Sequence, residues 1–291
     1  MSIMTKLEFQ IDFSDSEKKL AEYILNRGEK ILQMSARDLA KDTYTSPATI
    51  VRLCQKLGLK GYSDFKIKYS AELQADLNKN NRIDVNFPFN KNDRKEEIAH
   101  KIAIVNREAI EDTLYLIDYD ELEKIVDLLH EAKVIDIYGL GNSILAALDF
   151  EHKMMRIGRN IRIKTLPGEQ SFQAYNASID HISIILSYSG ETIEMVHIAE
   201  LLKEKKSKII LITSIGENEL SKYADYIINV ASREKIFRKI APFASKTSIQ
   251  YILDVIFSCI FQKDYEKNVE YKISMDNKYD HRHPHSPVND D

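Results

Sequence analysis

Five short apolar or β-branched runs, most of them separated by segments with helical spacing, limit the fold of this chain more than any other feature. They cover residues 134–138, 161–164, 182–186, 209–213 and 226–230. Between two of them, Met195, Ile198, Ala199 and Leu202 follow the i, i+3, i+4, i+7 spacing of a helix with one apolar face. Repeated strand–helix units predict a mostly parallel, five-stranded sheet that helices cover on its faces.

The N-terminal part of the chain has a purely helical pattern. Ser14 and Glu17 have the spacing of a capping box, which predicts a helix that runs to about Asn26 and stops at Gly28. Shorter helices are expected over residues 35–41 and 47–57, and Gly58 is placed to end the second. Further along, we expect helices over 94–117, 119–131 and 245–261.

The segment NKNNRIDVNFPFNKND, residues 78–93, is the best candidate for a linker between domains. It is polar, rich in asparagine and contains Pro88, and a length of 291 residues favours about two domains. We therefore predict a helical domain over 1–77, a linker over 78–93, an α/β domain with leading helices over 94–265 and a polar tail over 266–291.

Residues 35–57 have the pattern of two helices joined by a tight turn. Ser46 is placed as an N-cap and Pro47 as the first helical residue. Leu39, Ala40, Ile50, Leu53 and Leu57 are expected to face inward, and Ala48, Thr49, Arg52, Gln55 and Lys56 outward. A helix-turn-helix presents its second helix to the DNA major groove in this way.

A local basic face accompanies this motif, although the whole chain has a net charge of −4. It is formed by Arg52, Lys56, Lys60, Lys66 and Lys68, and positive charge of this kind is needed for contact with DNA phosphates. The spacing alone leaves DNA binding and a plain helical bundle with a solvated polar face equally open.

The stretch SPATIVRLCQKLGLKGYSDFK, residues 46–66, resembles the helix-turn-helix of the RpiR family of bacterial transcription regulators, and the likeness extends over about residues 13–77. The resemblance implies a set of DNA-binding residues: Ser46, Pro47, Ala48, Thr49, Arg52, Lys56, Lys60, Tyr62 and Lys66. The family usually has glycine in the turn where this chain has Tyr44, and more apolar residues at Thr43 and Thr45. A left-handed backbone at a residue other than glycine costs on the order of 1 kcal/mol.

Two loops rich in small and hydroxyl residues follow predicted strands. They read GLGNS, residues 139–143, and SYSGET, residues 187–192. Hydroxyls and the N–H groups of a helix start both donate hydrogen bonds to a small anion such as phosphate. If the strand order is 2-1-3-4-5, both loops lie at the point where the order reverses, which is where open parallel sheets bind ligands. The alternative is a pair of ordinary capped helix starts.

Residues from about 133 to 230 resemble a SIS (sugar isomerase) domain, whose phosphosugar-binding elements GxGxS and SxSGET recur here. Thr213 and Ser214 match the end of its fourth strand, and Tyr188 replaces a polar residue that is often seen there. The resemblance implies that Ser143, Ser187, Ser189 and Thr192 contact the phosphate. The full set of candidate ligand-binding residues is Gly139, Gly141, Asn142, Ser143, Ser187, Tyr188, Ser189, Gly190 and Thr192.

Catalysis finds little support in the sequence. Isomerisation of a sugar phosphate needs a positioned base, and the candidates are His152, Glu169 and His181, with Glu169 the best placed. The run HRHPH at 281–285 lies in a polar tail where a metal site is not expected, and no cofactor motif is present. A phosphosugar isomerase with an appended helical domain is the alternative to a regulator.

The domain order favours a DNA-binding regulator that responds to a phosphorylated sugar. Its expected partners are an operator in double-stranded DNA, a phosphosugar effector and further copies of the chain in a homodimer or homotetramer, because helix-turn-helix proteins read paired half-sites. Only Cys54 and Cys259 are present, and the sequence lacks a signal peptide or a spanning apolar run. We expect a cytoplasmic protein that does not enter membranes.

Overall fold

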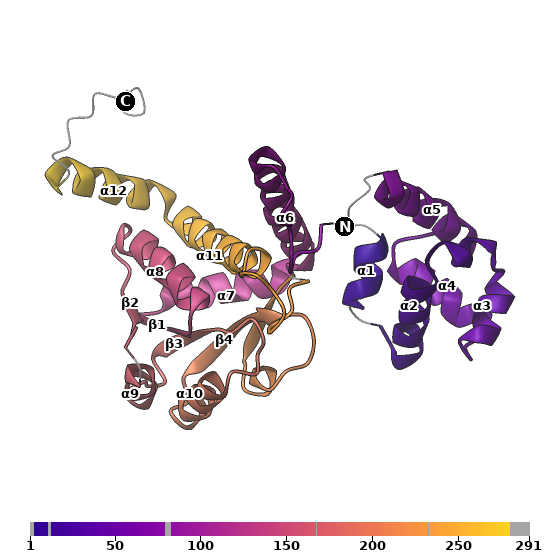
Figure 1. Cartoon of the computed structure of the whole chain (residues 1–291). Helices are drawn as coiled ribbons and strands as arrows, with labels where there is room; N and C mark the ends of the chain where they lie inside the picture. Colours follow the sequence, from indigo (N-terminus) through magenta and orange to yellow (C-terminus); the bar gives the residue numbers. More distant parts are fainter. Residues whose placement is uncertain (1–2, 11–12, 79–82, 167, 232, 280–291) are drawn as a thin grey trace. The chain divides into compact units, whose positions relative to one another are not determined.

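The computed structural model describes residues 3–10, 13–78, 83–166, 168–231 and 233–279 (Figure 1). The chain divides into two compact units between Asp84 and Val85, and each unit is considered by itself. No helix among these residues is long and apolar enough to cross a membrane. The run at 281–285 lies outside the described residues.

The first unit is all helical. Its elements are α1 (Ile3–Phe9), α2 (Asp15–Arg27), the 3₁₀ helix η1 (Gly28–Gln33), α3 (Ala36–Asp42), α4 (Pro47–Lys56) and α5 (Tyr62–Asn78). The predicted capping box at Ser14 and Glu17 is present, and Gly28 ends α2 with φ 55°. Apolar side chains from all of these elements share one core, in which Leu20, Phe65 and Tyr69 are almost fully buried.

The turn between α3 and α4 forms with tyrosine at the position of the usual glycine. Tyr44 has φ 53°, in the left-handed region, and its side chain is 98% exposed. Ser46 then caps α4, because its hydroxyl accepts a hydrogen bond from the N–H of Thr49 at 3.2 Å, and Pro47 is the first helical residue. The turn therefore takes the left-handed conformation at the expense of backbone strain at Tyr44.

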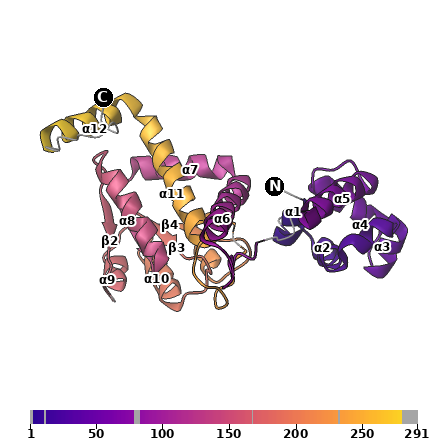
Figure 2. The ribbon, with the colours of Figure 1, turned by 45° about the horizontal axis from the view of Figure 1, so that its top comes forward.

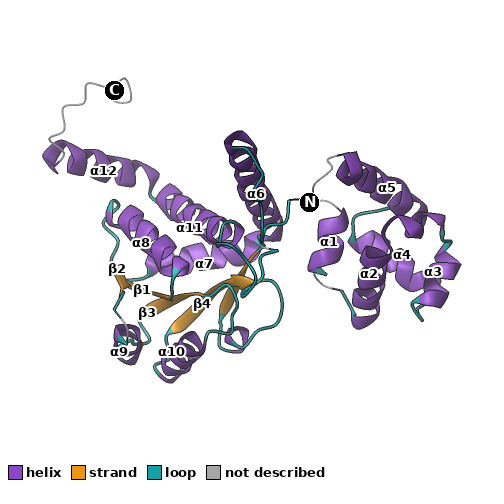
Figure 3. Cartoon of the chain, viewed as in Figure 1, coloured by secondary structure: helices purple, strands orange, loops and turns teal. Residues whose placement is uncertain are grey.

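The second unit is an α/β layer structure (Figure 3). Its strands are β1 (Val134–Gly139), β2 (Ile161–Ile163), β3 (His181–Leu186), β4 (Lys208–Ser214) and β5 (Tyr226–Val230). Its helices are α6 (Lys95–Leu116), α7 (Tyr119–Glu131), α8 (Asn142–Met155), α9 (Glu169–Tyr175), α10 (Ile193–Glu204), α11 (Ala244–Lys263) and α12 (Tyr265–Tyr279), with the 3₁₀ helix η2 (Leu220–Lys222). The strand order is β2-β1-β3-β4-β5 and every pairing is parallel, which confirms the predicted sheet.

Helices cover both faces of this sheet (Figures 1 and 2). On one face α7, α8 and α11 pack on Ile135, Ile137, Ile184 and other strand residues, and on the other α9 and α10 pack on Tyr138, Ile185 and Leu211. Successive side chains of one strand enter different cores, because they point to opposite faces of the sheet. The C-terminal segment, for which the sequence predicts only a polar tail from residue 266, contains α12.

Candidate functional site

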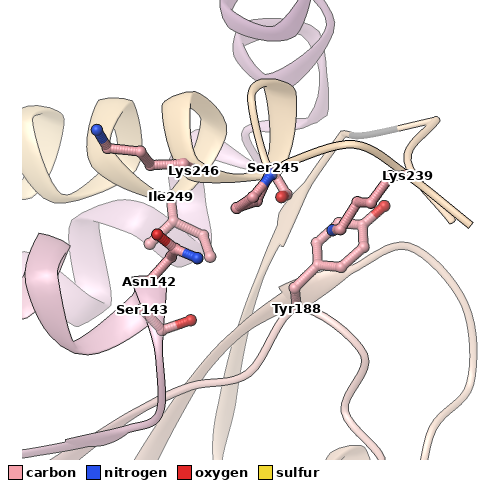
Figure 4. A pocket seen from close by; sticks show the side chains of 8 residues that line it. Asn142, Ser143, Tyr188, Lys239, Ser245, Lys246 and Ile249 are labelled. Carbon is pink, nitrogen blue, oxygen red and sulfur yellow. The ribbon is translucent and has the colours of Figure 1, made fainter. Parts of the chain in front are cut away.

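Two adjoining pockets lie at the carboxyl edge of the sheet, where the strand order reverses between β1 and β3. Their volumes are about 190 and 240 Å³, and Ser143, Tyr188 and Lys239 line both of them. The smaller pocket is lined by Leu140, Ser143, Leu186, Ser187, Tyr188, Ser189, Thr192, Met195, Ile236 and Lys239. The larger is lined by Asn142, Ser143, Tyr188, Lys239, Pro242, Ser245, Lys246 and Ile249 (Figure 4).

The GLGNS loop connects β1 to α8. Gly139 is held at the end of its strand by the amide of Gln170, which accepts from the Gly139 N–H at 3.1 Å and donates to its carbonyl at 2.8 Å. Gly141 has φ 56° and is the residue before the first turn of α8. Asn142 and Ser143 therefore lie at the N-terminus of α8, the end at which the helix dipole favours an anion.

The SYSGET loop connects β3 to α10 and makes a tight turn at Gly190. Gly190 has φ 67°, and a Cβ at this position would lie 2.0 Å from Cγ of Asn218, so only glycine fits. Ser187 is buried and its hydroxyl lies 3.4 Å from that of Thr192, the residue that precedes α10. The hydroxyl of Ser189 accepts a hydrogen bond from the N–H of Glu191 at 3.2 Å.

These loops come together as the strand order predicts. The predicted ligand residues that line a pocket are Asn142, Ser143, Ser187, Tyr188, Ser189 and Thr192. Gly139, Gly141 and Gly190 are not among the lining residues but set the course of the two loops. Binding of a ligand by any of these residues stays a prediction.

The loop that joins β5 to α11 adds pocket residues for which the sequence carries no motif. Lys239 lines both pockets, and its Nζ lies 2.9 Å from Oε2 of Glu234 and 5.5 Å from the centre of the Tyr188 ring. The carboxylate of Glu234 is buried and also accepts hydrogen bonds from the N–H of Ala244 and the hydroxyl of Ser245, at the start of α11. Its charge and its place in the last predicted helix of the SIS unit are the only features of the sequence that point to Lys246, and none points to Lys239.

The two pockets combine positive charge with helix starts, a combination that favours an anion. Lys239 and Lys246 line them, and α8, α10 and α11 begin at or next to lining residues. Glu234 offsets part of this charge, because it pairs with Lys239 and accepts a hydrogen bond from the first N–H of α11. In Figure 4 the side chain of Lys239 lies beside the Tyr188 ring, whereas that of Lys246 runs along α11 and points its ammonium away from Tyr188. Lys239 is therefore the cation better placed for a ligand at the serine loops.

The candidate bases of an isomerase lie elsewhere. Glu169, His152 and His181 are absent from the lining of both pockets. His181 begins β3, at the opposite edge of the sheet from the loops, and its Nδ1 lies 2.9 Å from Oδ2 of the fully buried Asp136. Arg162 holds the same carboxylate with two hydrogen bonds of 2.6 and 2.8 Å. Within the described ranges no cluster of His, Cys, Asp and Glu residues could hold a metal ion.

In the helix-turn-helix, the outward face of α4 is largely as predicted, with one correction. Ser46, Pro47, Ala48 and Arg52 are exposed, but Thr49 is only 5% exposed, because it is drawn inward beside its cap. Its hydroxyl lies 3.0 Å from that of Ser46 and accepts a hydrogen bond from Arg52 at 3.2 Å. Thr49 is thus placed to orient Arg52 and not to face solvent itself.

The remaining candidates for DNA contact differ in their surroundings. Lys60 is exposed, whereas Lys56 pairs with the buried Glu17 at 2.8 Å. Tyr62 is half-buried and donates to the carbonyls of Ile31 and Met34, both at 3.3 Å; burial raises the pKa of its hydroxyl to about 12. The ammonium of Lys66 lies 5.5 Å from the centre of the Tyr62 ring. The structure thus leaves Arg52 and Lys60 as the cations that are freest to reach a phosphate.

Comparisons with known proteins agree with this two-unit architecture. Residues 1–76 match the family model described as a helix-turn-helix domain of the rpiR family, and residues 128–258 match the SIS domain. An uncharacterised HTH-type transcriptional regulator of Caldanaerobacter subterraneus is 32% identical over 91% of this chain and 92% of its own length. The uncharacterised regulator YbbH of Bacillus subtilis is 31% identical over 88% of this chain and 89% of its own.

Among solved structures, the NanR protein of Vibrio vulnificus, complexed with ManNAc-6P, is 26% identical, with a TM-score of 0.59 over 97% of this chain and all of that one. The sugar isomerase domain of an RpiR transcription factor from Sphaerobacter thermophilus shares the fold of 62% of the chain, with a TM-score of 0.55 at 16% identity. Three relatives that match over most of their own length are named as transcriptional regulators. The chain belongs to the RpiR family of helix-turn-helix transcriptional regulators, with a C-terminal SIS domain.

Proposed function

We propose that this regulator controls genes of sugar metabolism and that a phosphorylated sugar in the SIS pocket modulates its binding to an operator. The observation that carries the proposal is the meeting of two hydroxyl-rich loops and Lys239 at the start of three helices. Hydroxyls, helix-start N–H groups and one ammonium suit the phosphate dianion. The adjoining pocket, lined by Tyr188, Ile249 and Asn142, offers room for a sugar ring.

The phosphate is expected to contact Ser143, Ser187, Ser189 and Thr192, since these hydroxyls surround the smaller pocket. The operator is expected to contact the exposed face of α4 and the residues after it, chiefly Ser46, Pro47, Ala48, Arg52, Lys60 and Lys66. The regulator is expected to act in the cytoplasm. It is expected to bind as a homodimer or homotetramer, because helix-turn-helix proteins read paired half-sites. The effect of the sugar is linkage, because a ligand shifts operator affinity only by binding the two states differently.

A thermal-shift screen tests the pocket. The probes are N-acetylmannosamine 6-phosphate, the molecule bound by the NanR relative, together with glucosamine, glucose and fructose 6-phosphates and the unphosphorylated sugars as controls. A probe that binds only the folded chain raises its melting temperature, so at least one phosphate, and not its parent sugar, should do so. Turnover of a probe in a coupled isomerase assay would overturn the proposal.

A binding assay on DNA tests the other unit. An operator is selected from a random-sequence library by the wild-type chain and its affinity is measured with and without the probe that shifts the melting temperature. We expect specific binding that weakens with salt and changes with the probe. Failure to enrich any DNA sequence at low salt would contradict the assignment of the first unit.

A further inference from the structure

The first residues of the SIS unit are hydrogen-bonded to the loop that joins β5 to α11, which lines both pockets. Asn86, the second residue of that unit, accepts a hydrogen bond from the N–H of Lys235 through its side-chain Oδ1 at 2.7 Å. Its backbone carbonyl accepts another from the N–H of Ile240 at 2.9 Å. Asn86 is 9% exposed. Both ends of the stretch from Lys235 to Ile240 are therefore held by one residue.

This stretch carries the cation of the candidate site. Lys239 lies between the two anchored residues and lines both pockets. The loop is fixed on either side of the stretch: Arg233 lies 3.3 Å from Asp112 of α6, and the carboxylate of Glu234 binds the first N–H of α11. A displacement of Lys239 is thus confined to the stretch from Lys235 to Ile240, which is the part that Asn86 holds.

A phosphate in the smaller pocket would compete with Glu234 for Lys239. The Lys239–Glu234 ion pair is short, at 2.9 Å, and largely buried, and a phosphate beside Lys239 would draw its ammonium away from Glu234. We expect this pull to reach the backbone of the stretch from Lys235 to Ile240 and so the two hydrogen bonds to Asn86. The chain leads from Asn86 back through Val85 and Asp84 toward α5 of the helix-turn-helix unit.

We propose that Asn86 couples the sugar pocket to DNA binding, by tying the Lys235–Ile240 stretch to the segment that leads to the helix-turn-helix. The inference rests on the proposed function. Asn86 precedes α6, so this connection does not run through that helix. Phe89, whose ring lies 6.4 Å from that of Phe243 in an edge-to-face contact, docks the same segment beside the start of α11.

The test uses the full-length chain with three substitutions. Asn86→Ala removes the acceptor for Lys235, Asn86→Asp keeps an oxygen there, and Phe87→Ala is a matched control whose side chain is 48% exposed in the same segment. The probes are the sugar 6-phosphates and the selected operator described above. In the wild type and in Phe87→Ala, the active sugar phosphate should change operator affinity by about fivefold or more.

Asn86→Ala should keep the rise in melting temperature that the sugar phosphate causes. Its operator affinities with and without that probe should differ by no more than about twofold. Asn86→Asp should restore the response. A wild-type operator response in Asn86→Ala would overturn the proposal. So would a loss of sugar binding in Asn86→Ala as large as the loss of response, because Asn86 would then act on the pocket and not on the coupling.

A second measurement needs no sugar and separates this inference from the proposed function. Lys239→Gln breaks the ion pair with Glu234 from the pocket side. It should change operator affinity in the wild-type background but not in Asn86→Ala, a double-mutant cycle that reports coupling. An equal change in both backgrounds, or no change in either, overturns the role of Asn86. Absence of any melting-temperature shift with all the sugar phosphates overturns the effector instead.

Discussion

The phenolic hydroxyl of Tyr188 donates a hydrogen bond to the backbone carbonyl of Glu234 at 3.0 Å. This bond joins the SYSGET loop to the residue whose carboxylate holds Lys239 and the start of α11. Tyr188 stands where related domains often have another polar residue, and here it fastens the β5–α11 loop over the pocket. Its position makes it a structural link as well as a wall of both pockets.

Tyr188→Phe removes this bond and keeps the ring beside Lys239. The unfolding free energy of the SIS unit should fall by about 1 kcal/mol, as for a typical hydrogen bond, and affinity for the active sugar phosphate should fall with it. Urea unfolding followed by circular dichroism and calorimetric titration measure the two effects. Unchanged sugar affinity would show that binding does not depend on the hydrogen bond from Tyr188 to the β5–α11 loop.

Gly190→Ala should be far more damaging than Gly141→Ala, although both glycines have positive φ. A side chain is strained at either position, because positive φ favours glycine. At Gly141 a Cβ meets nothing within 4 Å, whereas at Gly190 it would overlap Asn218, which is itself held by hydrogen bonds to Thr213 and Ser221. Melting temperatures of the two variants give the comparison, and equal losses would contradict it.

Ser189→Ala and Arg52→Ala should each weaken a different binding activity, because the two residues lie in different units. Loss of the Ser189 hydroxyl should weaken sugar binding about tenfold, because a hydrogen bond to a charged group contributes about 1.5 kcal/mol or more. Operator affinity in the absence of sugar should stay unchanged. Arg52→Ala should weaken operator binding and leave the sugar-induced melting shift intact. Equal loss of both activities in either variant would mean that the sites are not separate.

Tyr44→Asn should stabilise the chain. Asparagine accepts the left-handed conformation more readily than tyrosine, and the Tyr44 side chain, 98% exposed, gives up little packing. We expect the unfolding free energy to rise by up to about 1 kcal/mol in urea titrations. Operator affinity should not change; a clear fall would place the Tyr44 ring against the DNA.

The sequence predicted the framework of the site because both of its loops follow strands with strong apolar patterns. The 2-1-3-4-5 order that brings Ser143 and Ser187 together was a condition of the prediction, since open parallel sheets adopt more than one order, and the structure has this order. Lys239 and Glu234 could not be found in this way, since their loop has no periodic pattern and its course depends on contacts with Tyr188 and Asn86.

Thr49 was misplaced for a related reason. Helical spacing puts it at the rim of the polar face of α4, and only the capping geometry at Ser46 decides which way its hydroxyl turns. Spacing along a helix predicts which face a residue belongs to. For a residue at the border of two faces, contacts with its neighbours decide whether it is buried or exposed. Lys56 faces outward as predicted, but its ion pair with Glu17 could not be found from helical spacing, because Glu17 lies on another helix.

Glu17 gives the helix-turn-helix unit a dependence on pH that Glu17→Gln should remove. Burial alone would raise the pKa of this carboxyl, but the hydrogen bonds from Lys56 and Ser14 outweigh burial and hold the pKa below its ordinary value of 4.5. A carboxyl with a lowered pKa in the folded state stabilises the fold above the unfolded pKa, and this contribution is lost as pH falls through the folded value.

Glu17→Gln should therefore lower the melting temperature at pH 7, and the difference from the wild type should shrink as pH falls below about 4.5. Glu22→Gln, in the same helix and exposed, is the matched control and should change little at any pH. Calorimetric scans across this range make the comparison. A difference that stays constant with pH would mean that Glu17 acts through its shape and its neutral hydrogen bonds, and not through its charge.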